Sequence, residues 1–131
     1  MTAEEKIHAN AQLVLDRLRS LSDLQTRFGY NHESVKWVEQ FIEQQRSPAD
    51  VTASAIAKLT RILGSYLGEC IIHTYGGAWK QRDNQWGVFF DESNAVFPFN
   101  KVGKQFQNGL AGGDSILSFF ELIGPVILKR P

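Results

Sequence analysis

The sequence predicts an α+β domain with three N-terminal helices, the third of them long, a three-stranded antiparallel meander and two short C-terminal helices. Up to residue 75, apolar residues recur at steps of three and four, which is the spacing of a helix with one buried face. After Gly76-Gly77 the apolar residues alternate with other residues, which is typical of a strand. The change of period indicates that a helix is followed by a small sheet.

The first two helices are expected over residues 3–25 and 31–46. Thr2 and Glu5 have the spacing of a capping box, in which each side chain bonds to a free amide of the other residue. The segment Phe28-Gly29-Tyr30 interrupts the helical pattern, and Asn31 is a favourable N-cap for the second helix. One face of each helix carries the residues expected to point inward: Ile7, Ala11, Val14, Leu15, Leu18 and Leu21, then Trp37, Val38, Phe41 and Ile42.

The third helix is expected to begin at Ser47-Pro48-Ala49-Asp50 and to run to Tyr75. Serine caps a helix, and proline is tolerated in its first turn because the amide there has no helical partner. Gly64 and Gly68 lie four residues apart inside this helix and predict the close approach of another backbone, that of helix one or two. Gly76-Gly77 is expected to end the helix, because glycine adopts the left-handed conformation at little cost.

The sheet is expected to follow directly, with Trp86, Val88 and Phe90 facing the core. Pro98 cannot donate a ladder hydrogen bond, so the third strand should be an edge strand or end there. The expected strands are Ala78–Asp83, Trp86–Asp91 and Ala95–Phe99, joined by Asn84-Gln85 and by Glu92-Ser93-Asn94.

Two short helices are expected to complete the chain. Asn100 is a suitable cap for the first, which Asn108-Gly109 should end. Asp114 is a suitable cap for the second, which should run to Ile123 and stop at Gly124-Pro125.

Composition limits the possible classes of function. A chain of 131 residues is expected to form one domain, 1–131, with a helical part at 1–46 and the remaining elements at 47–131. Its 14 basic residues are balanced by 14 acidic residues, and the basic residues form no cluster along the sequence. We therefore do not expect nucleic-acid binding. The N-terminus lacks the basic and apolar regions of a signal peptide, and no apolar run approaches the roughly 18 residues that span a bilayer. We therefore expect a cytoplasmic protein without membrane contact.

Glu69, Cys70 and His73 form one candidate chemical site, because residues three and four apart meet on a helix. They have the residue types of a thiolate nucleophile with a base and an orienting carboxylate, or of three metal ligands. The alternative is structural: Cys70 lies on the apolar stripe as a small hydrophobic residue, and the negative helix end favours His73. The structural interpretation is preferred, so no catalytic residue, metal or cofactor is expected.

A second candidate site is a partner-binding surface on the meander. Tryptophan and arginine are the residue types that most often anchor protein interfaces. If Trp86 faces the core, the neighbouring strand can present basic side chains outward, beside acidic residues at the next turn. The residues of this candidate surface are Trp79, Lys80, Arg82, Asp83, Asp91 and Glu92. The alternative is that the tryptophans belong to the core and the charges only solvate the turns.

The pattern GG-x-W, then WGV, then VFPFNKVGKQ and NG resembles that of small uncharacterised bacterial domains of unknown function. The resemblance covers Leu63 to about Asn108 and the last helix, and residues 1–46 lie outside it. It implies a compact bacterial α+β protein. Small bacterial proteins of this kind include immunity proteins, which neutralise a cognate toxin, although the resemblance assigns no residue to that role.

The function expected from the sequence is that of a non-enzymatic, cytoplasmic protein-binding domain. A bacterial immunity protein acting on a toxin or effector, or an adaptor, is the specific form of this hypothesis. A small enzyme or ligand-binding protein that uses Glu69, Cys70 and His73 is the alternative. Whether the chain is a monomer or a homodimer stays open.

Overall fold

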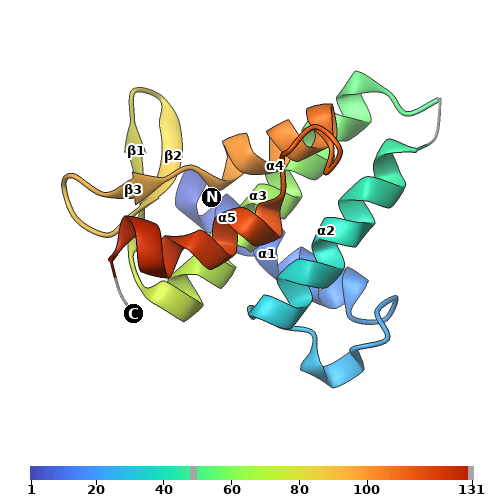
Figure 1. Ribbon diagram of the computed structural model, residues 1–131, viewed down its shortest axis with the longest axis horizontal. Coiled ribbons are helices and arrows are strands. Elements are labelled where there is room, and N and C mark those ends of the chain that lie inside the picture. Colours follow the sequence, from blue (N-terminus) through green and yellow to red (C-terminus); the bar gives the residue numbers. More distant parts are fainter. Residues whose placement is uncertain (48–49, 130–131) are drawn as a thin grey trace.

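The computed structural model describes residues 1–47 and 50–129, and it confirms the predicted α+β class (Figure 1). The sheet has three antiparallel strands in the order β1-β2-β3. In the sequence, helices precede and follow the sheet. The elements are α1 (Ala3–Leu18), a 3₁₀ turn (Gln25–Arg27), α2 (His32–Arg46), α3 (Ala53–Tyr75), β1 (Ala78–Arg82), β2 (Gln85–Phe89), β3 (Ala95–Val96), α4 (Pro98–Asn108), α5 (Ile116–Leu122) and a π-helical turn (Ile123–Ile127).

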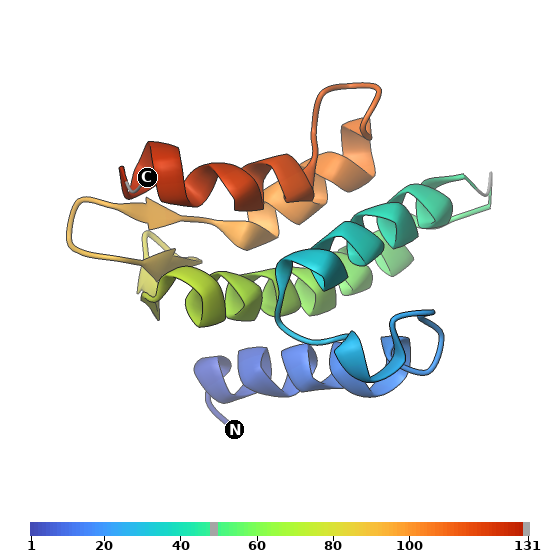
Figure 2. The same cartoon turned by 60° about the horizontal axis from the view of Figure 1, so that its bottom comes forward.

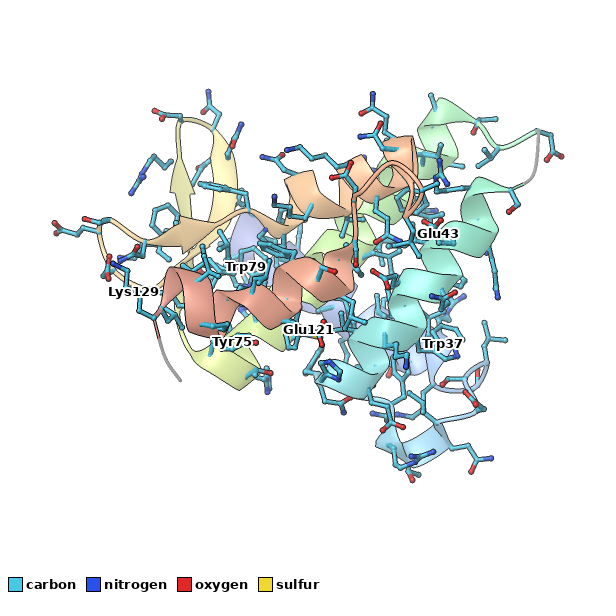
Figure 3. The ribbon with its side chains drawn as sticks, viewed as in Figure 1. Trp37, Glu43, Tyr75, Trp79, Glu121 and Lys129 are labelled. Atoms are coloured by element: carbon cyan, nitrogen blue, oxygen red, sulfur yellow. The ribbon has the colours of Figure 1, made fainter. Side chains whose placement is uncertain are left out.

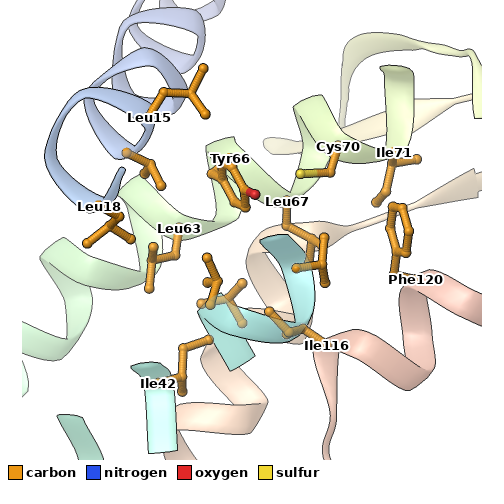
Figure 4. Close-up of a cluster of buried hydrophobic side chains, with 14 of the residues drawn as sticks. Leu15, Leu18, Ile42, Leu63, Tyr66, Leu67, Cys70, Ile71, Ile116 and Phe120 are labelled. Atoms are coloured by element: carbon orange, nitrogen blue, oxygen red, sulfur yellow. The ribbon is translucent and has the colours of Figure 1, made fainter. Parts of the chain in front are cut away.

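Helix α3 is the central element of the fold. Figure 2 shows α1 on one side of it and α4 and α5 on the other, with α2 beside it. Every residue from Leu63 to Ile71 is buried, as expected of a helix that is covered on all sides. Side chains of α3 pack against side chains of α1, α2 and α5 in the hydrophobic core (Figure 4).

The caps predicted for the first two helices are confirmed. Thr2 and Glu5 form a capping box, and the Asn31 side chain accepts a hydrogen bond from the Ser34 amide. Helix α1, however, ends at Leu18 rather than near residue 25, and Leu21 is 69% exposed. The chain turns there because the following segment buries Phe28, whose carbonyl oxygen accepts two hydrogen bonds from the Arg19 guanidinium.

The predicted start of the third helix is wrong. Ser47 is the C-cap of α2, and α3 begins at Ala53 after Thr52, whose hydroxyl accepts from the Ala55 amide at 3.0 Å. Thr52 performs the capping that was expected of Ser47, since Ser47 follows directly on α2. Residues 48 and 49, on which the proline argument depends, lie outside the described residues. The predicted end is confirmed, because Gly76 caps α3 with φ of 90°.

The close approach of a backbone that was predicted at Gly64 and Gly68 is confirmed only at Gly64, and the expected partner, helix one or two, is wrong. A Cβ on Gly64 would lie 3.0 Å from the Cα of Phe99 in α4, and one on Gly68 would lie 2.1 Å from the indole ring of Trp79. The glycine face of α3 is therefore covered by the later part of the chain, and not by α1 or α2. Its small residues leave room for large aromatic rings.

The sheet is shorter than predicted. Asp83 and Asn84 form the β1–β2 turn with φ values of 53° and 65°, as in a type I′ hairpin turn, one residue earlier than expected. Strand β2 ends at Phe89, and β3 ends at Val96 because Pro98 occupies the first turn of α4. Proline's fixed φ is suited to that position, so Phe99 belongs to a helix and Asn100 is not its cap.

The last helix also differs at both ends. Ser115, rather than Asp114, caps α5 by accepting from the Ser118 amide. The Asp114 carboxylate instead accepts from the Asn108 side chain at 2.7 Å. Gly124-Pro125 does not stop the helical path, which continues as the π-helical turn over Ile123–Ile127.

Buried polar side chains join α2, α4 and α5. Gln105 is fully buried, and its amide nitrogen donates to the Glu39 carbonyl oxygen and to the Glu43 carboxylate. Its amide oxygen accepts from the Ile116 backbone at 2.9 Å. The Glu39 carboxylate accepts from the Ser115 hydroxyl and, at 3.1 Å, from the Leu117 amide. These contacts attach the start of α5 to α2.

Within the described part of the chain, no helix combines the length and the apolar character that crossing a membrane requires.

Candidate functional site

The structure does not assemble Glu69, Cys70 and His73 into one reactive group. The Glu69 carboxylate accepts from the Trp79 indole nitrogen at 2.8 Å and lies 3.3 Å from Nδ1 of His8. His73 is exposed, and its ring lies 4.7 Å from that of Tyr30. In residues 1–47 and 50–129, no three His, Cys, Asp or Glu side chains are grouped so that they could hold a metal ion.

Cys70 is fully buried in the core, where it lies next to Tyr66 and Leu67 on α3. Burial raises the pKa of the Cys70 thiol well above its ordinary value, and the nearby Glu69 carboxylate acts in the same direction. A nucleophilic cysteine requires the opposite, a lowered pKa and partial exposure. The environment of Cys70 therefore favours the structural interpretation of this residue.

The raised thiol pKa predicts a loss of stability at alkaline pH. The unfolded thiol ionises near its ordinary value of 9.0, whereas the folded thiol keeps its proton to higher pH. The stabilisation is therefore complete below about pH 9 and falls above it, by about 1.4 kcal/mol per pH unit for this one group. Urea unfolding between pH 7 and pH 10 measures the slope.

The Cys70→Ala variant is the control for this prediction. It should be less stable at neutral pH, because it leaves a small cavity, but its stability should fall less steeply above pH 9. Equal slopes for the two proteins would show that the folded thiol ionises normally.

Trp79 does not lie on the surface predicted for partner binding. It is only 6% exposed, and Figure 3 shows it at the junction between the sheet and the helices. Its ring packs against α3 at Gly68, and its indole nitrogen donates to the buried Glu69 carboxylate. Trp79 therefore attaches the β1–β2 hairpin to the central helix.

The charged members of that predicted surface are exposed, as expected, although several of them stabilise turns. The Arg82 guanidinium donates to the Glu92 carbonyl oxygen at 2.9 Å and lies 4.7 Å from the centre of the Phe89 ring. The Asp91 carboxylate accepts hydrogen bonds from Asn94 and from the Ser93 amide, in the turn that follows β2. These hydrogen bonds lower the pKa of Asp91. Lys80 and Asp83 are exposed on the same hairpin.

A cleft of about 580 Å³ lies beside this hairpin, at a place that the sequence does not indicate. It is bounded by the first turns of α1, the middle of α3, the β1–β2 turn with Trp86, and the start of α4. The residues that line it are Ala3, Lys6, Ile7, Asn10, Thr60, Arg61, Ser65, Asn84, Gln85, Trp86, Phe97, Phe99 and Asn100.

The lining of the cleft combines aromatic rings with positive charge. Trp86, Phe97 and Phe99 are each half-buried. Lys6 and Arg61 are exposed, and the described lining holds no carboxylate, although the chain as a whole carries equal numbers of acidic and basic residues. A ligand that complements this lining has apolar surface and negative charge.

Close packing holds the Phe97 and Phe99 rings in place. A Cβ on Gly87 would lie 2.8 Å from the Phe97 ring, so this ring lies directly across β2. The ring of Phe99 lies against Gly64 and 5.7 Å from the Trp79 ring. The buried Trp79 thereby fixes a ring that lines the cleft.

Asparagine and glutamine supply the other polar groups of the cleft. The Thr60 and Ser65 hydroxyls donate to carbonyl oxygens of their own helix, at 2.8 Å each. The side chains of Asn10, Gln85 and Asn100 line the cleft as amides, which both donate and accept hydrogen bonds. Such groups orient a ligand without requiring a charge on it.

Comparisons with protein-family models, with curated proteins and with solved structures find no match to this chain.

Proposed function

We propose that this chain is a non-enzymatic protein-binding domain whose cleft binds an acidic segment of a partner protein that carries an apolar or aromatic side chain. The observation that carries the proposal is the lining of the cleft, with Trp86, Phe97 and Phe99 beside Lys6 and Arg61 and no described carboxylate. Tryptophan and arginine are enriched among the residues that dominate binding energy at interfaces.

The size and packing of the cleft are suited to binding a partner. A volume of about 580 Å³ lies in the range of pockets that enclose a ligand or a few side chains. The Phe97 and Phe99 rings are held by contacts with Gly64, Gly87 and Trp79, so these two rings need little ordering when a partner binds. A preformed surface of this kind favours affinity.

The specific form of the proposal is an immunity protein that neutralises a cognate toxin in the bacterial cytoplasm, or an adaptor. Neutralisation requires only tight one-to-one binding, which a preformed cleft with charge complementarity supports. Co-expression with a candidate toxin tests this form: protection of the host cells should require Arg61.

Affinity capture from a lysate of the source organism tests the proposal, with Arg61→Glu as the cleft variant and Lys36→Glu as its control. Lys36 is exposed on α2 and lies outside the cleft. Both variants replace a positive side chain with a negative one, so they differ only in where the change of charge is made. The wild type and Lys36→Glu should retain one stoichiometric partner. Arg61→Glu should bind that purified partner at least ten-fold more weakly.

Two results would contradict the proposal. Equal retention of the partner by Arg61→Glu and Lys36→Glu would show that the cleft is not the binding site. Rapid alkylation of Cys70 in the folded protein, together with turnover of a substrate that Cys70→Ala abolishes, would favour the small-enzyme alternative based on Glu69, Cys70 and His73.

A further inference from the structure

A second groove of about 480 Å³ continues the cleft on the other side of the α4 N-terminus. It runs between α4 and the helical path formed by α5 and the π-helical turn. Phe97 and Asn100 line both cavities, so the two adjoin. Lys101, Lys104, Asp114, Phe119, Leu122 and Val126 are also among its lining residues.

The groove exposes two large apolar side chains. Leu122 is 52% exposed and Val126 is 57% exposed, and they lie four residues apart on the same helical path. Phe119 and Ile127 are half-buried beside them. Leu122 and Val126 together form a short exposed apolar strip along one side of the groove.

Positive charge borders this strip. The ammonium group of Lys101 lies 5.3 Å from the centre of the Phe119 ring, and Lys104 is exposed one turn further along α4. Asp114 is the one carboxylate among the described lining residues, and it already accepts a hydrogen bond from Asn108. The two cavities together contain Lys6, Arg61, Lys101 and Lys104 against this single carboxylate.

We infer that the groove is the second half of the partner-binding surface and that it binds an acidic amphipathic helix of the partner. This inference rests on the proposed protein-binding function. A helix placed between two helices presents apolar residues at steps of three and four, which match the spacing of Leu122 and Val126. Its acidic residues would face Lys101 and Lys104. The adjoining cleft then binds the segment that follows this helix.

Charge argues against a second copy of this chain as the occupant. A symmetric dimer places the same patch of both copies face to face. Because this patch carries Lys101 and Lys104 against the single carboxylate of Asp114, such a dimer would bring two surfaces of net positive charge together, which is unfavourable. An acidic partner helix has the complementary charge.

Selection from a displayed library of random 16-residue peptides tests the inference. A helix of that length spans about 24 Å, which gives about four turns of helix to lie in the groove. The full chain is the target. Selected peptides should be enriched in Asp and Glu, with apolar residues at steps of three and four. Their affinity should fall at least ten-fold in Leu122→Ser and in Lys104→Glu, and should not change in Lys36→Glu. Because Leu122 and Lys104 are exposed, these variants should remain folded.

Each other outcome has a defined meaning. Failure to select acidic peptides, or enrichment of basic ones, overturns the inference. Peptides that lose affinity in Arg61→Glu but not in Lys104→Glu would overturn the groove assignment and leave the proposed function intact. Self-association that Leu122→Ser abolishes, or binding of the chain to phosphatidylglycerol vesicles through these lysines, would identify a different occupant and also overturn the inference.

Discussion

Replacing Gly68 with alanine is expected to lower the free energy of unfolding by about 3 kcal/mol, because the new methyl group has no space. Its Cβ would lie 2.1 Å from two carbon atoms of the Trp79 ring. That ring is rigid, and its nitrogen is hydrogen-bonded to the buried Glu69 carboxylate, so it cannot move without breaking this contact. Urea unfolding followed by tryptophan fluorescence measures the change.

Gly103→Ala is the matched control for Gly68→Ala. Gly103 also lies inside a helix, α4, but the nearest atom to its Cβ would be Cγ2 of Thr60 at 3.7 Å, an ordinary contact. Alanine is favoured over glycine in helices, so this variant should be up to about 1 kcal/mol more stable than the wild type. Similar effects of the two substitutions would show that Trp79 does not pack against Gly68 as described.

Glu39→Ala is expected to cost about 2 kcal/mol of unfolding free energy, because it leaves two partly buried donors without their partner. Glu39 is 5% exposed, and its carboxylate accepts from the Ser115 hydroxyl and from the Leu117 amide. It also supplies negative charge at the start of α5, where a helix favours it. Thermal or urea unfolding followed by circular dichroism measures the loss.

Gln40→Ala provides the control for Glu39→Ala, because Gln40 is the next residue on α2 and is exposed. Substitution of such a surface residue should change the free energy of unfolding by no more than about 0.5 kcal/mol. If Glu39→Ala were equally mild, the carboxylate would not hold α5 to α2. Because α5 forms one side of the groove, Glu39→Ala should also weaken peptide binding there.

Much of the helical part of the fold could be predicted because its signals are local. The caps at Thr2 and Asn31 act on amides within three residues, and Gly76 ends α3 through its own backbone conformation. Alternation after Gly77 correctly indicated antiparallel strands that follow one another in the chain. These features depend on neighbouring residues, so they can be recognised without knowledge of the rest of the molecule.

The errors occurred where two local signals competed. Ser47 and Thr52 both have the chemistry of a helix cap, and the end of α2 at Ser47 left Thr52 to begin α3. Pro98 is compatible with an edge strand and with the first turn of a helix, and the helix formed. Periodicity alone does not resolve such choices, because each alternative satisfies the same backbone groups.

The candidate site was decided by tertiary packing. Trp79 and Trp86 lie on the same hairpin, yet the glycine face of α3 buries Trp79 while Trp86 is left to line the cleft. The cleft itself requires α1, α3, the hairpin and the start of α4 to meet, and most of its polar residues are unremarkable when taken one at a time. Local hydrogen bonding and periodicity were sufficient for the order and type of most elements, although not for all of their ends. The positions of aromatic and charged side chains from distant segments depended on which surfaces could be packed together without clashes.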